Sequence, residues 1–216
     1  MFDLIGQRGE AETPILKGWL DPTADLESSS SLAEAAAQNI SRSASEQFLE
    51  MERWATDPEC HDNLRSIADS VAERLSAILE LAESGRIQLF RRLVLAEGDE
   101  PAPVEERPLR LGIYPLAANP MHWGHILVGL SAMASLRLDK VVFIIAGEDS
   151  RKPSMTSAET RHRLARSAIE TFNPLFEYSP LALHTSLDGE TNCGRLLALN
   201  ADQPLEAFYI SRNLKE

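Results

Sequence analysis

The run Lys140-Val-Val-Phe-Ile-Ile-Ala146 constrains the fold of this 216-residue chain most strongly. Its apolar and β-branched residues do not alternate with polar ones, which is typical of a strand buried on both faces of a parallel sheet. Parallel strands need crossover connections, and these are usually helices. The run therefore predicts an α/β domain around it.

Segments with strand and helix character alternate on both sides of this run. Strands are predicted at 109–114, 176–183 and 205–210, and helices at 122–136, 157–171 and 190–199. Short connections and strict alternation predict a Rossmann-like, doubly wound parallel sheet with right-handed crossovers.

The first half of the chain has helical signals instead. Ser31-Leu-Ala-Glu34 is a capping box that predicts a helix over about 32–55. Asp57-Pro58-Glu59 is a second start signal, and apolar residues then recur at helical spacing up to Gly85, which predicts a helix over 58–84. Residues 87–95 fit a short helix or a strand.

Residues 96–108, with the sequence AEGDEPAPVEERP, have the composition of a linker. We therefore expect three parts: an acidic, mainly helical N-terminal region at 1–95, the linker at 96–108, and an α/β domain at 109–216.

The acidic residues are concentrated before the same boundary, the end of the linker at residue 108. Residues 1–108 hold 10 Lys and Arg against 22 Asp and Glu, whereas residues 109–216 hold 11 of each. Phosphate contacts to nucleic acid or to an anionic membrane need Lys and Arg, so we expect neither partner. The absence of a long apolar run and of a signal peptide, together with two unpaired cysteines, predicts a soluble cytoplasmic protein.

The segment Asn119-Pro-Met-His122-Trp-Gly-His125 lies where the first strand passes into its helix. Ligands of open α/β sheets bind at the carboxyl ends of strands, and helix N-termini there favour anions. His122 and His125 are three residues apart and can both donate hydrogen bonds, while Gly124 leaves room for close approach. The spacing alone leaves three interpretations open: phosphate binding, a metal pair, or two histidines without a shared function.

The segment resembles the NP-x-H-x-G-H signature of the nucleotidyltransferase superfamily, and of nicotinate/nicotinamide mononucleotide adenylyltransferases in particular. The resemblance continues in order along the chain, over about 109–210. Ile144-Ile-Ala-Gly-Glu-Asp-Ser-Arg-Lys152-Pro is similar to the second strand and its lysine-bearing loop. Ser157-Ala-Glu-Thr-Arg161 is similar to the next helix, and Asn173-Pro-Leu-Phe-Glu-Tyr-Ser179 to the third strand.

This resemblance implies transfer of the adenylyl group of ATP to a phosphorylated small-molecule acceptor such as nicotinate mononucleotide, with Mg²⁺ bound to the phosphates. His122 and His125 would be the catalytic residues. The implied nucleotide- and phosphate-binding residues are Ala118, Asn119, His122, Gly124, His125, Lys152 and Arg161, and none is implied to bind metal. Lys152 could instead be a solvated loop lysine, and Arg161 a surface charge.

The chain also departs from the family pattern. Pro115-Leu-Ala-Ala118 replaces a glycine-rich entry, 188–195 matches the base-recognition segment only loosely, and the later S-x-x-x-R motif has no counterpart before Glu216. A shortened domain would leave an apolar sheet edge, so we expect self-association, as a homo-oligomer. Two alternatives stay open: a non-catalytic homologue that acts through protein partners, and a relative of cytidylyltransferases or pantetheine-phosphate adenylyltransferases.

Overall fold

The computed structural model describes residues 29–148, 152 and 154–211. Two long helices, α2 (Ser29–Trp54) and α3 (Pro58–Glu83), come first. The remaining elements alternate, and in chain order they are β1 (Leu109–Leu116), α4 (Trp123–Leu136), β2 (Lys140–Ile145), α5 (Ala158–Glu170), β3 (Phe176–Ser179), α6 (Gly189–Leu199) and β4 (Leu205–Tyr209).

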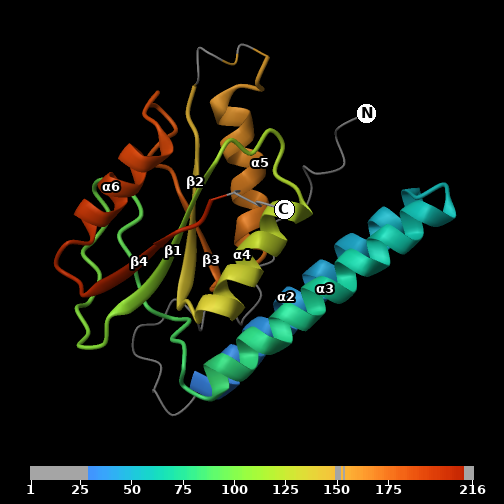
Figure 1. The fold of residues 1–216 in the computed structure, drawn as a ribbon, viewed down its shortest axis with the longest axis horizontal. Coiled ribbons are helices and arrows are strands. Elements are labelled where there is room, and N and C mark those ends of the chain that lie inside the picture. The colour runs from blue at the N-terminus through green and yellow to red at the C-terminus, as the bar shows by residue number, and fades with distance from the viewer. Residues whose placement is uncertain (1–28, 149–151, 153, 212–216) are drawn as a thin grey trace.

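The four strands form one parallel sheet in the order β3-β2-β1-β4. All six residues of β2 are buried, as the uninterrupted apolar run predicts. Alternate residues of β2 face opposite sides of the sheet: Phe143 packs in the cluster that contains α4 and α5, and Val142 in the cluster that contains α6. Figure 1 shows α6 on one side of the sheet and α4 and α5 on the other. The predicted Rossmann-like α/β fold, preceded by a helical region, is confirmed.

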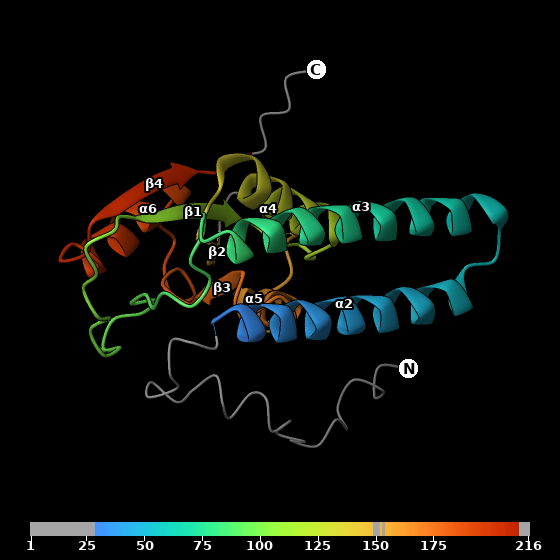
Figure 2. The same cartoon turned by 90° about the horizontal axis from the view of Figure 1, so that it is seen from below.

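The helices α2 and α3 form an antiparallel hairpin that packs on the α/β unit through α3 and α4. Figures 1 and 2 show the end of the hairpin at which α2 passes into α3 projecting away from the sheet. Phe48 of the hairpin stacks on Trp123 of α4, with ring centroids 4.4 Å apart, and Trp123 also meets the edge of Phe172. One hydrophobic cluster therefore runs from the hairpin into the sheet.

Residues 87–95 form neither a helix nor a strand, so both interpretations of this segment were wrong. The segment is held by side chains from distant parts of the chain rather than by its own backbone. Asn200 exchanges hydrogen bonds with the backbone of Val94, and Asp139 accepts one from the backbone N–H of Gln88. These bonds satisfy the backbone groups that a helix or a ladder would otherwise pair. The following residues, 96–108, are irregular as well, and their role as a linker between domains stays a prediction.

The strand expected over 176–183 ends at Ser179. Pro180 follows and has no N–H to donate, so the ladder stops and the chain turns back, with Leu183 and Thr185 bonding to the carbonyls of Pro180 and Ala182. The strands β3 and β4 form the two edges of the described sheet, and self-association through such an edge stays a prediction.

The two cysteines are free, as their separation in the sequence predicts. Burial raises the pKa of the Cys193 thiol on α6 to about 11, and the carboxylates of Glu190 and Asp188 add to this effect. Because the thiolate is the reactive form, we expect iodoacetamide at pH 8 to modify Cys60 well before Cys193 in the folded chain. Mass spectrometry over time checks this order, and in urea the two rates should become similar. Faster alkylation of Cys193 in the folded chain would contradict its burial.

Candidate functional site

The candidate site lies at the carboxyl ends of the parallel strands, where β1 and β2 pass into the loops before α4 and α5. Parallel pairing places the end of β1 beside the end of β2, with Leu116 opposite Ile145. The histidine segment and the lysine-bearing loop therefore follow their strands at the same edge of the sheet, and the helices α4 and α5 begin there.

His122 and His125 frame the start of α4. His122 is the N-cap residue, and its Nδ1 accepts a hydrogen bond from the backbone N–H of Gly124 at 3.1 Å. His125 is the third helical residue, and its Nδ1 accepts from the backbone N–H of His122 at 3.3 Å. The pair is a reciprocal capping box made of two imidazoles, whose ring centroids are 3.9 Å apart. His122 is exposed and His125 is buried.

These two hydrogen bonds determine where each neutral ring carries its proton. A ring nitrogen that accepts from an N–H has no hydrogen of its own, so the hydrogen lies on Nε2. Both histidines are therefore held in the tautomer that donates through Nε2, the nitrogen on the far side of each ring from the helix backbone. Two fixed donors at a helix N-terminus are suited to phosphate oxygens.

Gly124 lies close to the ring of His122. A Cβ at this position would lie 2.9 Å from Cε1 and 3.0 Å from Nδ1 of His122. The room for a phosphate that the sequence suggested at Gly124 stays a prediction.

We expect Gly124→Ala to weaken ligand binding at this site while leaving the stability of the folded chain unchanged or slightly higher. Alanine within a helix is favoured over glycine by up to about 1 kcal/mol, so α4 should not be weakened. The added methyl group should displace the ring of His122 and lower ATP affinity by about tenfold or more, because one fixed donor is lost. Calorimetric titration with ATP and Mg²⁺ and a urea melt give the two readouts. Unchanged ATP affinity would contradict the role assigned to Gly124.

The loop before the histidines is fixed by the burial of Ala118 and by a hydrogen bond of Asn119. Ala118 is buried, with a φ of 48°, which lies in the left-handed region that costs a residue with a side chain about 1 kcal/mol. The Oδ1 atom of Asn119 accepts a hydrogen bond from the backbone N–H of Thr156 at 3.2 Å, which joins this loop to the start of α5. Asn119 is therefore placed to orient the loop.

A pocket of about 340 Å³ opens beside this loop and the two histidines. Its walls are the end of β1, including Tyr114 and Pro115, the segment 116–120, and the side chains of His122 and His125. The structure thus brings Ala118, Asn119, His122 and His125 together around one cavity.

Arg161 does not lie on the surface, so that alternative is wrong: the residue is 1% exposed. Its guanidinium donates to four backbone carbonyls. Nη1 bonds to Ala117 and Ala146, Nη2 to Gly147 and Nε to Thr156, at 2.7 to 2.8 Å. Burial lowers the pKa of Arg161, an effect that the charge of Glu148 opposes. Arg161 therefore joins the loops that follow β1 and β2.

Lys152 is exposed and lines a second pocket, of about 260 Å³. This pocket shares Pro115, Leu116 and Ala117 with the first. Its other walls include Asn192, in the first turn of α6, and Tyr209, at the end of β4. The structure thus separates Lys152 from the histidines by the segment 115–117.

Two neighbouring residues were missed in the sequence. Glu148 accepts a hydrogen bond from the N–H of Ala158 at 2.7 Å, which helps to cap α5. A Cβ on Gly147 would lie 2.0 Å from the carbonyl oxygen of Thr185 and 2.2 Å from that of Ala182. Gly147 stands directly after a predicted strand, and a glycine at that position is a recognised sign of close backbone approach.

Among the described residues, no group of three or more His, Cys, Asp or Glu side chains could hold a metal ion. The described helices also include none that is long and apolar enough to cross a membrane.

Comparison with known proteins gives matches over the part of the chain that contains this site. Residues 117–216 match the family model described as cytidylyltransferase-like. A probable nicotinate-nucleotide adenylyltransferase of Roseiflexus sp. (strain RS-1) is 34% identical over 101 residues, covering 46% of this chain and 50% of that protein.

Proteins with the same name occur in other bacteria. The one from Thermoanaerobacter sp. (strain X514) is 34% identical over 79 residues, which cover 36% of this chain and 37% of the relative. The one from Thermus thermophilus is 32% identical over 75 residues, covering 35% and 40%. The chain thus spans between about a third and a half of the length of these relatives. The matched family model begins at Ala117, at the entry to the histidine loop, and covers nearly all of the α/β half of this chain. That half is similar to nucleotidyltransferases, and the relatives it matches are named nicotinate-nucleotide adenylyltransferases.

Proposed function

We propose that this protein transfers the adenylyl group of ATP to a mononucleotide such as nicotinate mononucleotide and releases pyrophosphate. An oxygen of the acceptor phosphate forms a bond to the α-phosphorus of ATP, and the bond from that phosphorus to the pyrophosphate oxygen breaks. Such a reaction depends on positioning and charge stabilisation rather than on a covalent nucleophile. The names of the relatives support this substrate pair.

One observation carries the proposal: two imidazoles at the start of α4 whose Nδ1 atoms both accept from backbone N–H groups. His122 and His125 would donate through Nε2 to the phosphate oxygens of ATP and stabilise the charge that develops as pyrophosphate leaves. Because the helix backbone fixes both rings, little reorganisation accompanies the reaction. Ala118, Asn119 and Gly124 would shape the phosphate loop around them.

The two pockets on either side of residues 115–117 suggest a division of the substrates. ATP phosphates would occupy the pocket with the histidines, and the acceptor would extend into the pocket with Lys152, whose ammonium group can contact a phosphate. Arg161 would act as a positioning residue, because its donors already bond to carbonyls of the loops around both pockets.

Mg²⁺ would enter with ATP. This ion prefers oxygen ligands, keeps several waters and is commonly held through substrate phosphates, so the donors near the histidines fit a metal carried by the nucleotide. When bound, it would neutralise part of the phosphate charge.

Pyrophosphate release tests the proposal. The purified chain is incubated with ATP or CTP, Mg²⁺ and one of three acceptors: nicotinate mononucleotide, nicotinamide mononucleotide or phosphopantetheine. We expect release with ATP and a pyridine mononucleotide, and a loss of at least about a hundredfold for His122→Ala or His125→Ala, the usual effect of removing a preorganised donor. Release with CTP or only with phosphopantetheine would favour the related transferase classes. ATP binding without release under any condition would favour the non-catalytic alternative.

A further inference from the structure

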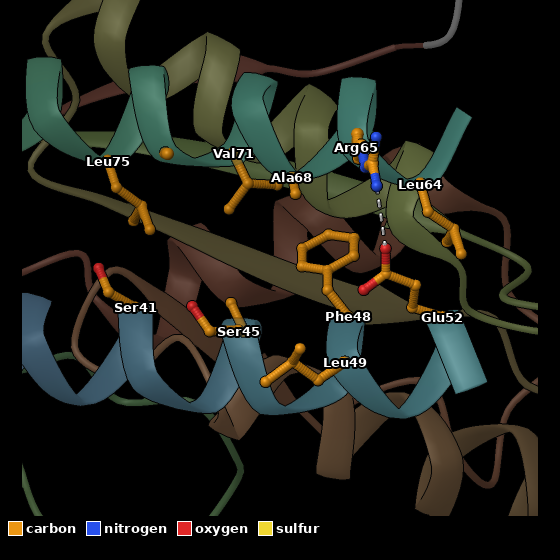
Figure 3. A pocket seen from close by; sticks show the side chains of 12 residues that line it. Ser41, Ser45, Phe48, Leu49, Glu52, Leu64, Arg65, Ala68, Val71 and Leu75 are labelled. Atoms are coloured by element: carbon orange, nitrogen blue, oxygen red, sulfur yellow. Dashed lines mark ion pairs between the residues drawn. The ribbon is translucent and has the colours of Figure 1, made fainter. Parts of the chain in front are cut away.

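The hairpin carries an apolar groove that the proposed reaction does not use. The groove has a volume of about 340 Å³ and lies between α2 and α3. Figure 3 shows Phe48 and Leu49 of α2 on one wall, and Ala68, Val71 and Leu75 of α3 on the other. Leu49 is 58% exposed at the rim.

Small side chains create this space. Ser41, Ala44 and Ser45 line the groove from α2, and Ala68 and Ala72 line it from α3. Residues of this size at facing positions cannot fill the gap between two helices as leucine would. The ion pair between Arg65 and Glu52, 3.7 Å apart, lies at the end nearer the hairpin tip (Figure 3), so most of the apolar wall lies between this pair and the start of α2.

The chain has an apolar segment that ends eight residues before the start of α2. Residues 1–28 lie outside the described residues, and within them Pro14-Ile-Leu-Lys-Gly-Trp-Leu20 places four large apolar side chains in seven positions. We propose that this segment, residues 14–20, is the occupant of the groove between α2 and α3.

The length of the chain that joins the two supports this assignment. Eight residues, 21–28, separate Leu20 from Ser29, and an extended chain of that length spans about 26 Å. At about 1.5 Å per residue, Ser45 lies about 24 Å along α2 from Ser29. Leu20 can therefore reach the middle of the groove if the chain runs back along α2.

Attachment to the same chain also favours this occupant over an external one. A segment on a short linker is present at an effective concentration in the millimolar range, far above that of a free partner. The groove carries one cation and one anion, paired with each other, so it imposes no strong charge requirement on what enters it. Binding in the groove would therefore depend on burying apolar side chains, which the segment supplies as Ile15, Leu16, Trp19 and Leu20.

Hydrogen–deuterium exchange on the full chain tests the proposal. The double variant Leu16→Asp/Trp19→Asp should expose the groove, so backbone amides of residues 44–52 and 64–72 should exchange about tenfold faster, as expected if the segment is docked about 90% of the time. The variant Leu4→Asp/Ile5→Asp adds the same charge and removes similar apolar surface in the same N-terminal stretch, and it should leave these amides unchanged. Exchange in β1 and β2 should not change in either variant.

A variant of the groove gives an independent readout. Ala68→Phe should fill the space without removing a core contact and so release the segment, which should make Trp19 more accessible to acrylamide quenching, measured against the same chain with Trp19→Phe. Unchanged exchange in the Leu16→Asp/Trp19→Asp variant would overturn the proposal. So would equal acceleration in the control variant, or protection of 44–52 that rises with protein concentration, because the latter identifies a second copy as the occupant.

Discussion

Replacing Arg161 by methionine is expected to lower the free energy of unfolding by about 3 to 5 kcal/mol, the range for removing one side of a buried charged interaction. The guanidinium is almost fully buried and bonds to four carbonyls. Methionine has similar length but no hydrogen-bond donor. The carbonyls of Ala117, Ala146, Gly147 and Thr156 would therefore lose their donor at a place that water reaches poorly, and unsatisfied buried acceptors are costly. Urea unfolding measures the change.

Arg163 supplies the matched control. It lies two residues along the same helix and is exposed, so Arg163→Met should change stability by no more than about 0.5 kcal/mol. Arg161→Lys should recover only part of the loss, because one ammonium group cannot reproduce the planar fork of the guanidinium. Equal effects of the Arg161→Met and Arg163→Met variants would refute the structural role of Arg161.

Gly147→Ala is the second substitution for which we expect a large effect, a loss of about 3 kcal/mol of unfolding free energy, at the upper end for overpacking. The new methyl group would meet two backbone oxygens at 2.0 and 2.2 Å, those of Thr185 and Ala182, and a backbone cannot move aside as a flexible side chain can. The turn at 182–185 would have to separate from the end of β2, which also opens the pocket that Lys152 lines.

Gly194→Ala on α6 is its control, because apart from the neighbouring residues and the backbone of its own helix no atom lies within 4 Å of the added Cβ. This variant should be neutral or more stable by up to about 1 kcal/mol, since alanine favours the helix. If thermal or urea melts show the same change in stability for Gly147→Ala and Gly194→Ala, the close approach of the 182–185 turn to Gly147 would be contradicted.

Patterns local in sequence predicted most of the fold. The buried run at 140–146 became β2, and both N-terminal helices lie within a few residues of their expected bounds. The segment 87–95 could not be predicted, because Asn200 and Asp139, distant in sequence, satisfy its backbone. The strand at 176–183 was predicted too long because apolar residues continue past Pro180, although that residue ends the ladder.

The candidate site shows the same division. The spacing of His122 and His125 placed them together at the start of a helix, and the structure agrees. Their tautomers depend on backbone geometry that a sequence does not display. Arg161 could be interpreted as a phosphate ligand or a surface charge, because its actual partners come from three segments that meet only when the sheet forms.

We propose that the two histidines at the start of α4 bind nucleotide phosphates. The most direct test is the shift in melting temperature produced by ATP and Mg²⁺ in the wild type, in His125→Ala and in His61→Ala, a control histidine on α3. Ligand that binds only the folded chain raises its stability, so we predict a shift in the wild type and in His61→Ala and none in His125→Ala. The absence of a shift in the wild type with ATP, CTP and nicotinate mononucleotide, or a full shift in His125→Ala, would contradict the claim.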